Sequence, residues 1–221
     1  MGKFAARASS IALVGILAAV CSAQTGNVEK IGPLSDAAIP EAVRHTLDPA
    51  GYRVSLDDGT TFELWLRQHV PAQAKKDAAD VLYPQLAEST LVGVLHFPKG
   101  GSDYRGQMIS AGFYTLRYEL IPSDGNHLGA APNRDFLLLV PAASDADPNA
   151  LFKFSDLVAL SQKATGTGHP GPLSLVQPEN SGSAPAVSKD DQDHWTFSAS
   201  MELSTGERIS FALVVKGTAQ Q

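Results

Sequence analysis

One short polar stretch, Asp124-Gly-Asn126-His127, carries the side chains best suited to chemistry. Carboxylate, amide and imidazole groups on one loop can bind a cation, hydrogen-bond a sugar or exchange protons. The same residues also suit a Gly-Asn turn in which Asp124 caps backbone amides, and both interpretations stay open. His169, just before Pro170, is the best distant partner for His127, because a helix before it can bring its loop to the same end of a sheet.

A metal site at this place would need more ligands, which His96 or Asp135 could supply. The six histidines are spread widely along the chain, so the local ligand spacing of a metal site is missing. The run Asp145-x-Asp147-x-Asn149 lacks the glycine and the distal glutamate of an EF-hand calcium loop. We therefore predict no metal site.

Three arginines lie close to acidic residues in the same part of the chain. Internal pairing would make them a structural set that fixes the long loops, whereas a guanidinium left free would form a fork for a carboxylate or phosphate. Both readings stay open. The candidate ligand-binding residues are therefore Arg105, Arg117, Asp124, Asn126, His127, Arg134, Asp135 and His169.

Familiar catalytic and cofactor motifs are missing from the sequence. Residues 166–171 match the letters of the dinucleotide fingerprint G-x-G-x-x-G, but a helical pattern precedes them instead of a strand, and Pro170 would disturb a following helix. No G-x-S-x-G elbow, H-E-x-x-H pair, Walker loop or C-x-x-C pair occurs. We predict no cofactor and assign no catalytic residue.

Alternating apolar and polar residues predict the elements that would position this site. Seven strands are expected, at residues 52–56, 60–66, 91–97, 112–120, 135–140, 195–203 and 208–215. The first two are expected to form a hairpin turned at residues 57–59, and the last two a hairpin turned at residues 204–206. One helix is expected at roughly 155–165, with Ser155 as its N-cap and Gly166 as its stop. Many strands, one helix and no βαβ alternation predict a mainly β protein, an antiparallel β-sandwich of about seven strands.

The chain begins with a basic start, an apolar run from Ile11 to Val20 and the small residues Cys21-Ser-Ala23, a pattern typical of a secretory signal peptide. Cleavage after Ala23 predicts a secreted or periplasmic protein with no membrane span. The formal net charge is −6, and loss of Lys3 and Arg7 makes it more negative, which argues against nucleic acid as a partner. Residues 24–50 are expected to be a loosely ordered lead-in, and 51–217 one domain with a flexible insert at 177–193.

Several motifs are shared with a group of known sequences. Residues 103–107 (DYRGQ), Gly112-x-Tyr-Thr-Leu-Arg-Tyr118, Pro122-x-Asp-Gly-Asn-His127, Arg134-Asp-Phe-Leu-Leu-Leu139 and His169-Pro170 form a pattern that resembles uncharacterised single-domain proteins exported by bacteria. The Gly-x-Tyr-Thr-Leu element is also similar to one in transthyretin-like and carbohydrate-binding-like β-sandwich domains. These resemblances imply a β-sandwich and no particular activity.

The leading functional expectation is a non-enzymatic, exported module that binds a small molecule or a carbohydrate at the loops carrying the candidate residues, in the cell envelope or outside it. An alternative is a hydrolase or isomerase of envelope carbohydrates, with His127 and Asp124 or Asp135 as proton carriers. A second alternative is a structural or assembly component whose edge strand pairs with a neighbour. The sequence identifies no protein partner.

Overall fold

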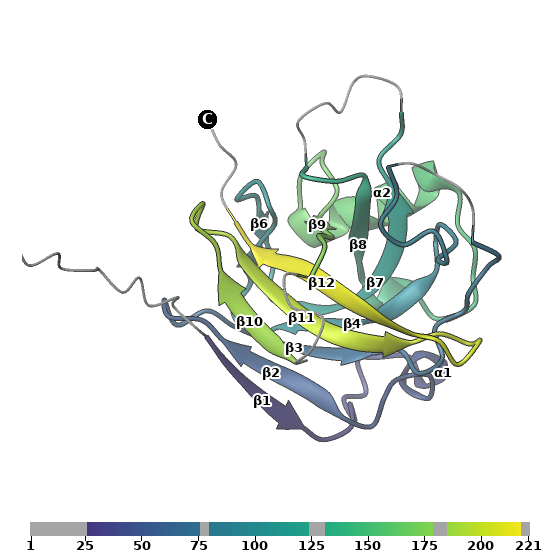
Figure 1. Cartoon of the computed structure of the whole chain (residues 1–221), viewed down its shortest axis with the longest axis horizontal. Coiled ribbons are helices and arrows are strands. Elements are labelled where there is room, and N and C mark those ends of the chain that lie inside the picture. Colours follow the sequence, from purple (N-terminus) through teal and green to yellow (C-terminus); the bar gives the residue numbers. More distant parts are fainter. Residues whose placement is uncertain (1–25, 76–79, 124–130, 179–184, 218–221) are drawn as a thin grey trace, which may run out of the picture.

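A computed structural model of the chain describes residues 26–75, 80–123, 131–178 and 185–217 (Figure 1). The expected signal peptide lies outside these residues, as do Asp124, Asn126 and His127. The strands are β1 (Asn27–Ile31), β2 (Gly51–Ser55), β3 (Thr61–Leu66), β4 (Leu91–Phe97), β5 (Gly101–Ser102), β6 (Met108–Ile109), β7 (Gly112–Leu120), β8 (Asp135–Pro141), β9 (Pro172–Ser174), β10 (Ala186–Lys189), β11 (Trp195–Glu202) and β12 (Arg208–Lys216). The helices are α1 (Glu41–Arg44), the short 3₁₀ helix η1 (Ala142–Ser144) and α2 (Phe154–Thr165).

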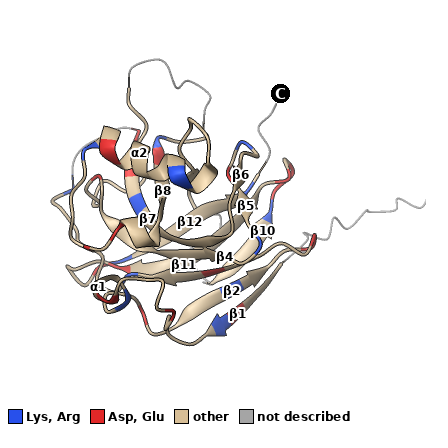
Figure 2. Ribbon diagram, turned by 180° about the vertical axis from the view of Figure 1, so that it is seen from behind, with Lys and Arg blue, Asp and Glu red and all other residues tan. Residues whose placement is uncertain are grey.

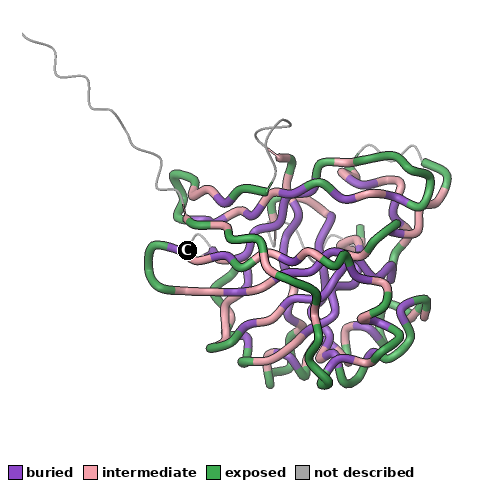
Figure 3. Tube along the Cα trace, turned by 90° about the horizontal axis from the view of Figure 1, so that it is seen from below, coloured by how far each residue is buried: buried purple, intermediate pink, exposed green. Residues whose placement is uncertain are grey.

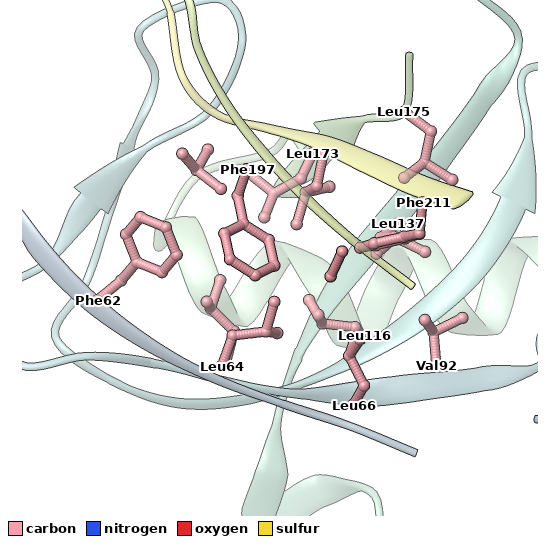
Figure 4. Close-up of a cluster of buried hydrophobic side chains, with 14 of the residues drawn as sticks. Phe62, Leu64, Leu66, Val92, Leu116, Leu137, Leu173, Leu175, Phe197 and Phe211 are labelled. Atoms are coloured by element: carbon pink, nitrogen blue, oxygen red, sulfur yellow. The ribbon is translucent and has the colours of Figure 1, made fainter. Parts of the chain in front are cut away.

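Two antiparallel sheets pack face to face, so the predicted mainly β sandwich is confirmed. The larger sheet has the strand order β1-β2-β3-β4-β7-β8-β9, and the smaller has the order β10-β11-β12. One apolar cluster fills the space between them; Phe197 of the small sheet lies beside Phe62 and Leu64 of the large one, and Phe211 lies beside Leu137 (Figure 4). The seven predicted strands all form: β4 and β8 are nearly continuous apolar runs and are buried along almost their whole length, and the others alternate apolar and polar residues.

Both predicted hairpins are present, and glycine makes their turns. The β2–β3 turn contains Gly59 at φ +81°, and the β11–β12 turn contains Gly206 at φ +84°. A left-handed backbone conformation is readily adopted by glycine, which lacks a Cβ atom. The strong alternation on either side then fixes the register, with Phe62 opposite Val54 and Phe211 opposite Ala199.

The two sheets also touch along their edges, so the sandwich approaches a flattened barrel. Beyond β9, Leu175 forms a bridge with Leu213 of β12, and the Val176 amide donates to the Ala212 carbonyl at 3.0 Å. On the other side Gly26, just before β1, lies so close to β10 that a Cβ atom there would be 2.8 Å from the Val187 side chain. Most of the buried residues lie in the middle of the molecule, and the exposed ones lie mainly on the outer loops (Figure 3).

Two segments are more regular than their composition suggested. In the expected loose lead-in, β1 pairs with β2 along the edge of the large sheet, and α1 packs Val43 against Trp65. The Trp65 indole is covered there and donates to the Gly32 carbonyl at 2.9 Å. In the expected insert at 177–193, residues 186–189 form strand β10. Both strands lie at sheet edges and expose much of their surface, which weakens the alternation that marks a strand.

An outer layer covers β7 and β8 on the side away from the small sheet. The helix α2 packs there through Leu157 against Phe136 and Leu138 of β8 (Figures 1 and 2). The helix ends as predicted, with Gly166 in the left-handed conformation at φ +65°. Its N-cap is Lys153 instead of the expected Ser155, and no side chain caps it.

Charged residues lie mostly at loops, turns and strand edges (Figure 2). Across the described ranges, no helix has both the length and the apolar character needed to cross a membrane.

Candidate functional site

The loop between β5 and β6 is held rigid by the carboxylate of Asp103. Its Oδ1 accepts the backbone N–H groups of Arg105 and Gln107, each at 2.9 Å, and its Oδ2 accepts the Gln107 amide at 3.1 Å. Gly106 turns the chain at φ +73°. Burial raises the pKa of Asp103, while the hydrogen bonds from Gln107 and Arg105 act in the opposite direction. The charged part of this loop that remains outside is the Arg105 side chain.

Gln107 joins this loop to the segment that follows α2. Its Nε2 donates to the Pro170 carbonyl at 2.8 Å, and its Oε1 accepts the Thr167 hydroxyl at 3.2 Å. The backbone of His169 is fixed as well, since its N–H donates to the Thr167 hydroxyl and its carbonyl accepts the Thr165 hydroxyl. Two segments more than 60 residues apart in sequence are thereby locked together.

Arg105 and His169 consequently line one groove of about 540 Å³, which we call the Arg105 groove. Both residues are exposed, and within the described part of the chain neither side chain makes a hydrogen bond. The rest of the lining is Asp103, Tyr104, Gly106, Gln107, Ile121, Pro122, Ala131, Phe136, Leu138, Phe154, Val158, Pro170, Pro172 and Ser174.

The lining of the Arg105 groove combines basic and apolar side chains. Phe136 and Leu138 of β8 and Val158 of α2 belong to the apolar part of the lining, as does Phe154, which is 38% exposed. Among the described lining residues the acidic side chain is Asp103, whose carboxylate is buried and already accepts three hydrogen bonds. The groove therefore offers cationic or polar contacts from Arg105 and His169 together with apolar surface.

Arg117 is placed elsewhere and is fully occupied by the protein itself. Its Nε and Nη2 bind the two oxygens of Asp145 at 2.8 and 2.7 Å, with both side chains buried. The three remaining N–H groups donate to the backbone carbonyls of Ser89, Ala150 and Asp147, each at 2.8 Å. All five donors of this guanidinium are thus satisfied, and it fixes the segment before α2.

Asp135 and Arg134 also contribute to the fold at their positions. The buried Asp135 carboxylate accepts the N–H groups of Leu82 and Tyr83 and the Tyr118 hydroxyl, the last at 2.7 Å. Burial and the hydrogen bond to Asp135 raise the pKa of Tyr118, so this phenol stays protonated. The Arg134 Nε donates to the Ile121 carbonyl at 3.0 Å, which closes the base of the loop between β7 and β8.

Of the eight candidate residues, the structure thus brings Arg105 and His169 to one groove, while Asp124, Asn126 and His127 lie outside the described residues. Sequence reasoning did not single out Gln107 or Phe154. Gln107 had a signal, because an aspartate four residues before it with an intervening glycine favours a tight, self-bonded loop. The exposure of Phe154 had none, since its place at the first turn of a helix is compatible with burial.

The part of the chain that the structure describes contains no group of three histidine, cysteine or acidic residues arranged to hold a metal ion. Comparisons with protein-family models, with curated proteins and with solved structures find no match for this chain.

Proposed function

We propose that this protein is an exported, non-enzymatic binding module, and that the Arg105 groove takes a molecule with an apolar part and an anionic group. The observation that carries the proposal is that two exposed basic residues, Arg105 and His169, line one groove together with apolar residues. The signal-like leader supports export to the periplasm or beyond it.

The geometry supports binding because the groove is preformed. The Arg105 N–H donates to Asp103, the His169 N–H donates to the Thr167 hydroxyl, and Gln107 donates to the neighbouring Pro170 carbonyl. The backbones that carry both residues therefore need little ordering when a ligand enters. A guanidinium matches a carboxylate or phosphate with two parallel hydrogen bonds, and apolar surface in a concave site adds affinity without direction.

The burial of Asp135 argues against a role for this residue in the enzymatic alternative, which proposed it as a proton carrier. Its oxygens accept three hydrogen bonds within the fold. A carboxylate in that setting is held in place and does not face a substrate.

Calorimetric titration of the purified protein with three probes tests the proposal. Octyl phosphate carries both chemical parts, octanol has the tail alone, and inorganic phosphate has the anion alone. We expect octyl phosphate to bind at least about tenfold more tightly than either fragment, since charge-assisted hydrogen bonds and apolar burial act together. Arg105→Ala and His169→Ala should each weaken binding of octyl phosphate by about tenfold.

Arg208→Ala is the matched control, because Arg208 is also an exposed arginine but does not line this groove. It should leave the affinity for octyl phosphate unchanged. If the Arg105→Ala and His169→Ala variants bind octyl phosphate as tightly as the unmodified protein, the Arg105 groove is not the binding site.

A further inference from the structure

A second groove, of about 280 Å³, lies on the outer face of the small sheet, and we call it the Ser198 groove. Alternation along β11 turns Trp195 and Phe197 into the core and leaves Thr196 and Ser198 on the opposite face. Its lining is rich in hydroxyl and amide groups: Tyr104, Pro132, Val176, Gln177, Ala186, Ser188, Asp190, Gln192, His194, Thr196, Ser198 and Val214.

The two grooves adjoin at Tyr104, which lines both of them. The Tyr104 ring stacks on the imidazole of His194 with ring centroids 4.7 Å apart and planes at 29°. His194 is itself fixed by Asp190, whose carboxylate accepts the His194 backbone N–H at 2.9 Å and lies 3.1 Å from its Nδ1. The junction is therefore built from anchored side chains.

Chain neighbours place the same two grooves side by side. Ala131 lines the Arg105 groove and Pro132 lines the Ser198 groove. Likewise, Ser174 lines the Arg105 groove and Val176 lines the Ser198 groove. Three separate segments thus border both grooves, so the two grooves lie next to each other.

Three kinds of lining follow one another across the two adjoining grooves. Phe154, Val158 and the β8 side chains give an apolar end, Arg105 beside Tyr104 gives a cationic middle, and Ser188, Thr196 and Ser198 give an end lined by hydroxyl groups. We propose that the ligand is an amphiphile whose apolar tail, anionic linkage and polyhydroxyl head, such as a sugar or cyclic polyol, occupy these three parts in that order.

The recognition of such a head follows from the residue types. Serine and threonine hydroxyls and glutamine amides can each donate and accept, so they match the alternating donors and acceptors of a polyol. The inference rests on the proposed function, because the head reaches the Ser198 groove when the tail and the anion occupy the Arg105 groove.

A matched pair of probes isolates the contribution of the head. Octanoyl lysophosphatidic acid and octanoyl lysophosphatidylinositol share the tail, and the second adds a cyclic polyol to the phosphate. Because its phosphodiester carries less negative charge than the phosphomonoester of the first, tighter binding of the inositol lipid reports contacts of the head. Both lipids are titrated below their micelle-forming concentrations. We expect the inositol lipid to bind at least tenfold more tightly than lysophosphatidic acid. Inositol 1-phosphate, which lacks the tail, should bind at least a hundredfold more weakly than the inositol lipid.

Variants in the Ser198 groove should abolish the tighter binding of the inositol lipid and leave the binding of lysophosphatidic acid unchanged. Ser198→Trp fills the groove and should reduce the affinity for the inositol lipid to that for lysophosphatidic acid, which stays unchanged. The double variant Ser188→Ala/Ser198→Ala removes hydroxyl groups with little risk to folding and should act in the same direction. Ser210→Trp, on the same face of the same sheet but outside the groove lining, should have no effect.

The outcomes separate the two proposals. If neither lipid binds, the proposed function fails. If both lipids bind with equal affinity, or if inositol 1-phosphate binds as tightly as the inositol lipid, the Arg105 groove can still bind anions but the tripartite ligand is overturned. A tenfold preference that survives Ser198→Trp would place the head outside the Ser198 groove and would equally overturn the inference.

Discussion

At the scale of single residues, Arg117 shows how a charged side chain can look functional and yet hold the fold together. Glu119 is the acidic residue near it in the sequence, but its partner is Asp145, 28 positions away. Three of its five donors go to backbone carbonyls. Sequence proximity could not reveal this pairing, because strand β7 turns Arg117 toward a segment that returns over the outer face of the sheet only after β8.

Removal of one partner of this buried pair should therefore be costly. Arg117→Leu leaves the Asp145 carboxylate buried without its counterion, and we expect a loss of about 3 to 5 kcal/mol of unfolding free energy. The double variant Arg117→Leu/Asp145→Leu should recover part of that loss, since no unpaired charge remains. Urea denaturation of both variants measures the difference, and a double variant less stable than Arg117→Leu alone would contradict the argument.

Glu119 makes the stability of the protein depend on pH. It is 1% exposed, and its burial, together with the nearby charge of Glu88, raises its pKa to about 7 from 4.5. The folded protein therefore binds this proton more tightly than the unfolded chain. The stabilisation of the fold that comes from protonated Glu119 is fully present below about pH 4.5 and is lost as the pH rises through 7.

Glu119→Gln should remove this dependence, because the amide mimics the protonated acid. We expect equal stability of the two proteins at pH 4.5 and a variant more stable by about 1 to 2 kcal/mol at pH 8. Thermal unfolding across this range supplies the measurement. A difference that stays constant with pH would show that ionisation of Glu119 is not its source.

At the scale of elements, strong alternation and glycine turns were enough to predict the main strands and both hairpins. Strands β1, β5, β6, β9 and β10 were not predicted, because they are short or lie at an edge and so bury too few side chains to show a period. The candidate site was hard to predict for the same reason, because its residues lie on short segments without a periodic pattern. Arg105 and His169 could be proposed from residue type, but their shared groove depends on Gln107, which joins two short loops without any periodic signal.

Gly93 illustrates a constraint between two elements that a pattern of apolar residues cannot express. It lies in β4, where a Cβ atom would come 2.4 Å from the Trp65 carbonyl oxygen of β3. Gly93→Ala should therefore force the two central strands apart and lower the unfolding free energy by about 2 kcal/mol or more. Gly32→Ala is the control, since a Cβ atom there has no neighbour within 4 Å.

Guanidinium denaturation compares the two glycine variants. A Gly93→Ala protein as stable as Gly32→Ala would mean that the backbone of β3 can move aside without cost.

At the scale of the whole molecule, the two layers could be predicted from the sequence, but not the seam, which is the place where the segment after β9 joins strand β12. The joining depends on single contacts between distant segments, such as the bridge from Leu175 to Leu213. Tyr83 strengthens this seam. Its hydroxyl donates to the Val176 carbonyl at 3.1 Å and accepts the Ala212 amide at 3.2 Å, and burial raises its pKa to about 12. Because one phenol serves both sides of the seam, the two sheets should unfold as a single cooperative unit.

The two tryptophans make this testable, since Trp65 lies in the large sheet and Trp195 in the small one. In Trp65→Phe and Trp195→Phe proteins, the remaining fluorophore should report the same denaturant midpoint. Adding Tyr83→Phe should lower the unfolding free energy by about 2 kcal/mol and shift both midpoints down together, because the buried Ala212 amide loses its acceptor. Tyr114→Phe should cost about 1 kcal/mol, since its hydroxyl makes one bond, to the Ser110 carbonyl of a nearby turn. Separate transitions of the two tryptophans would instead mean that the sheets are stabilised independently and that the seam does not couple them.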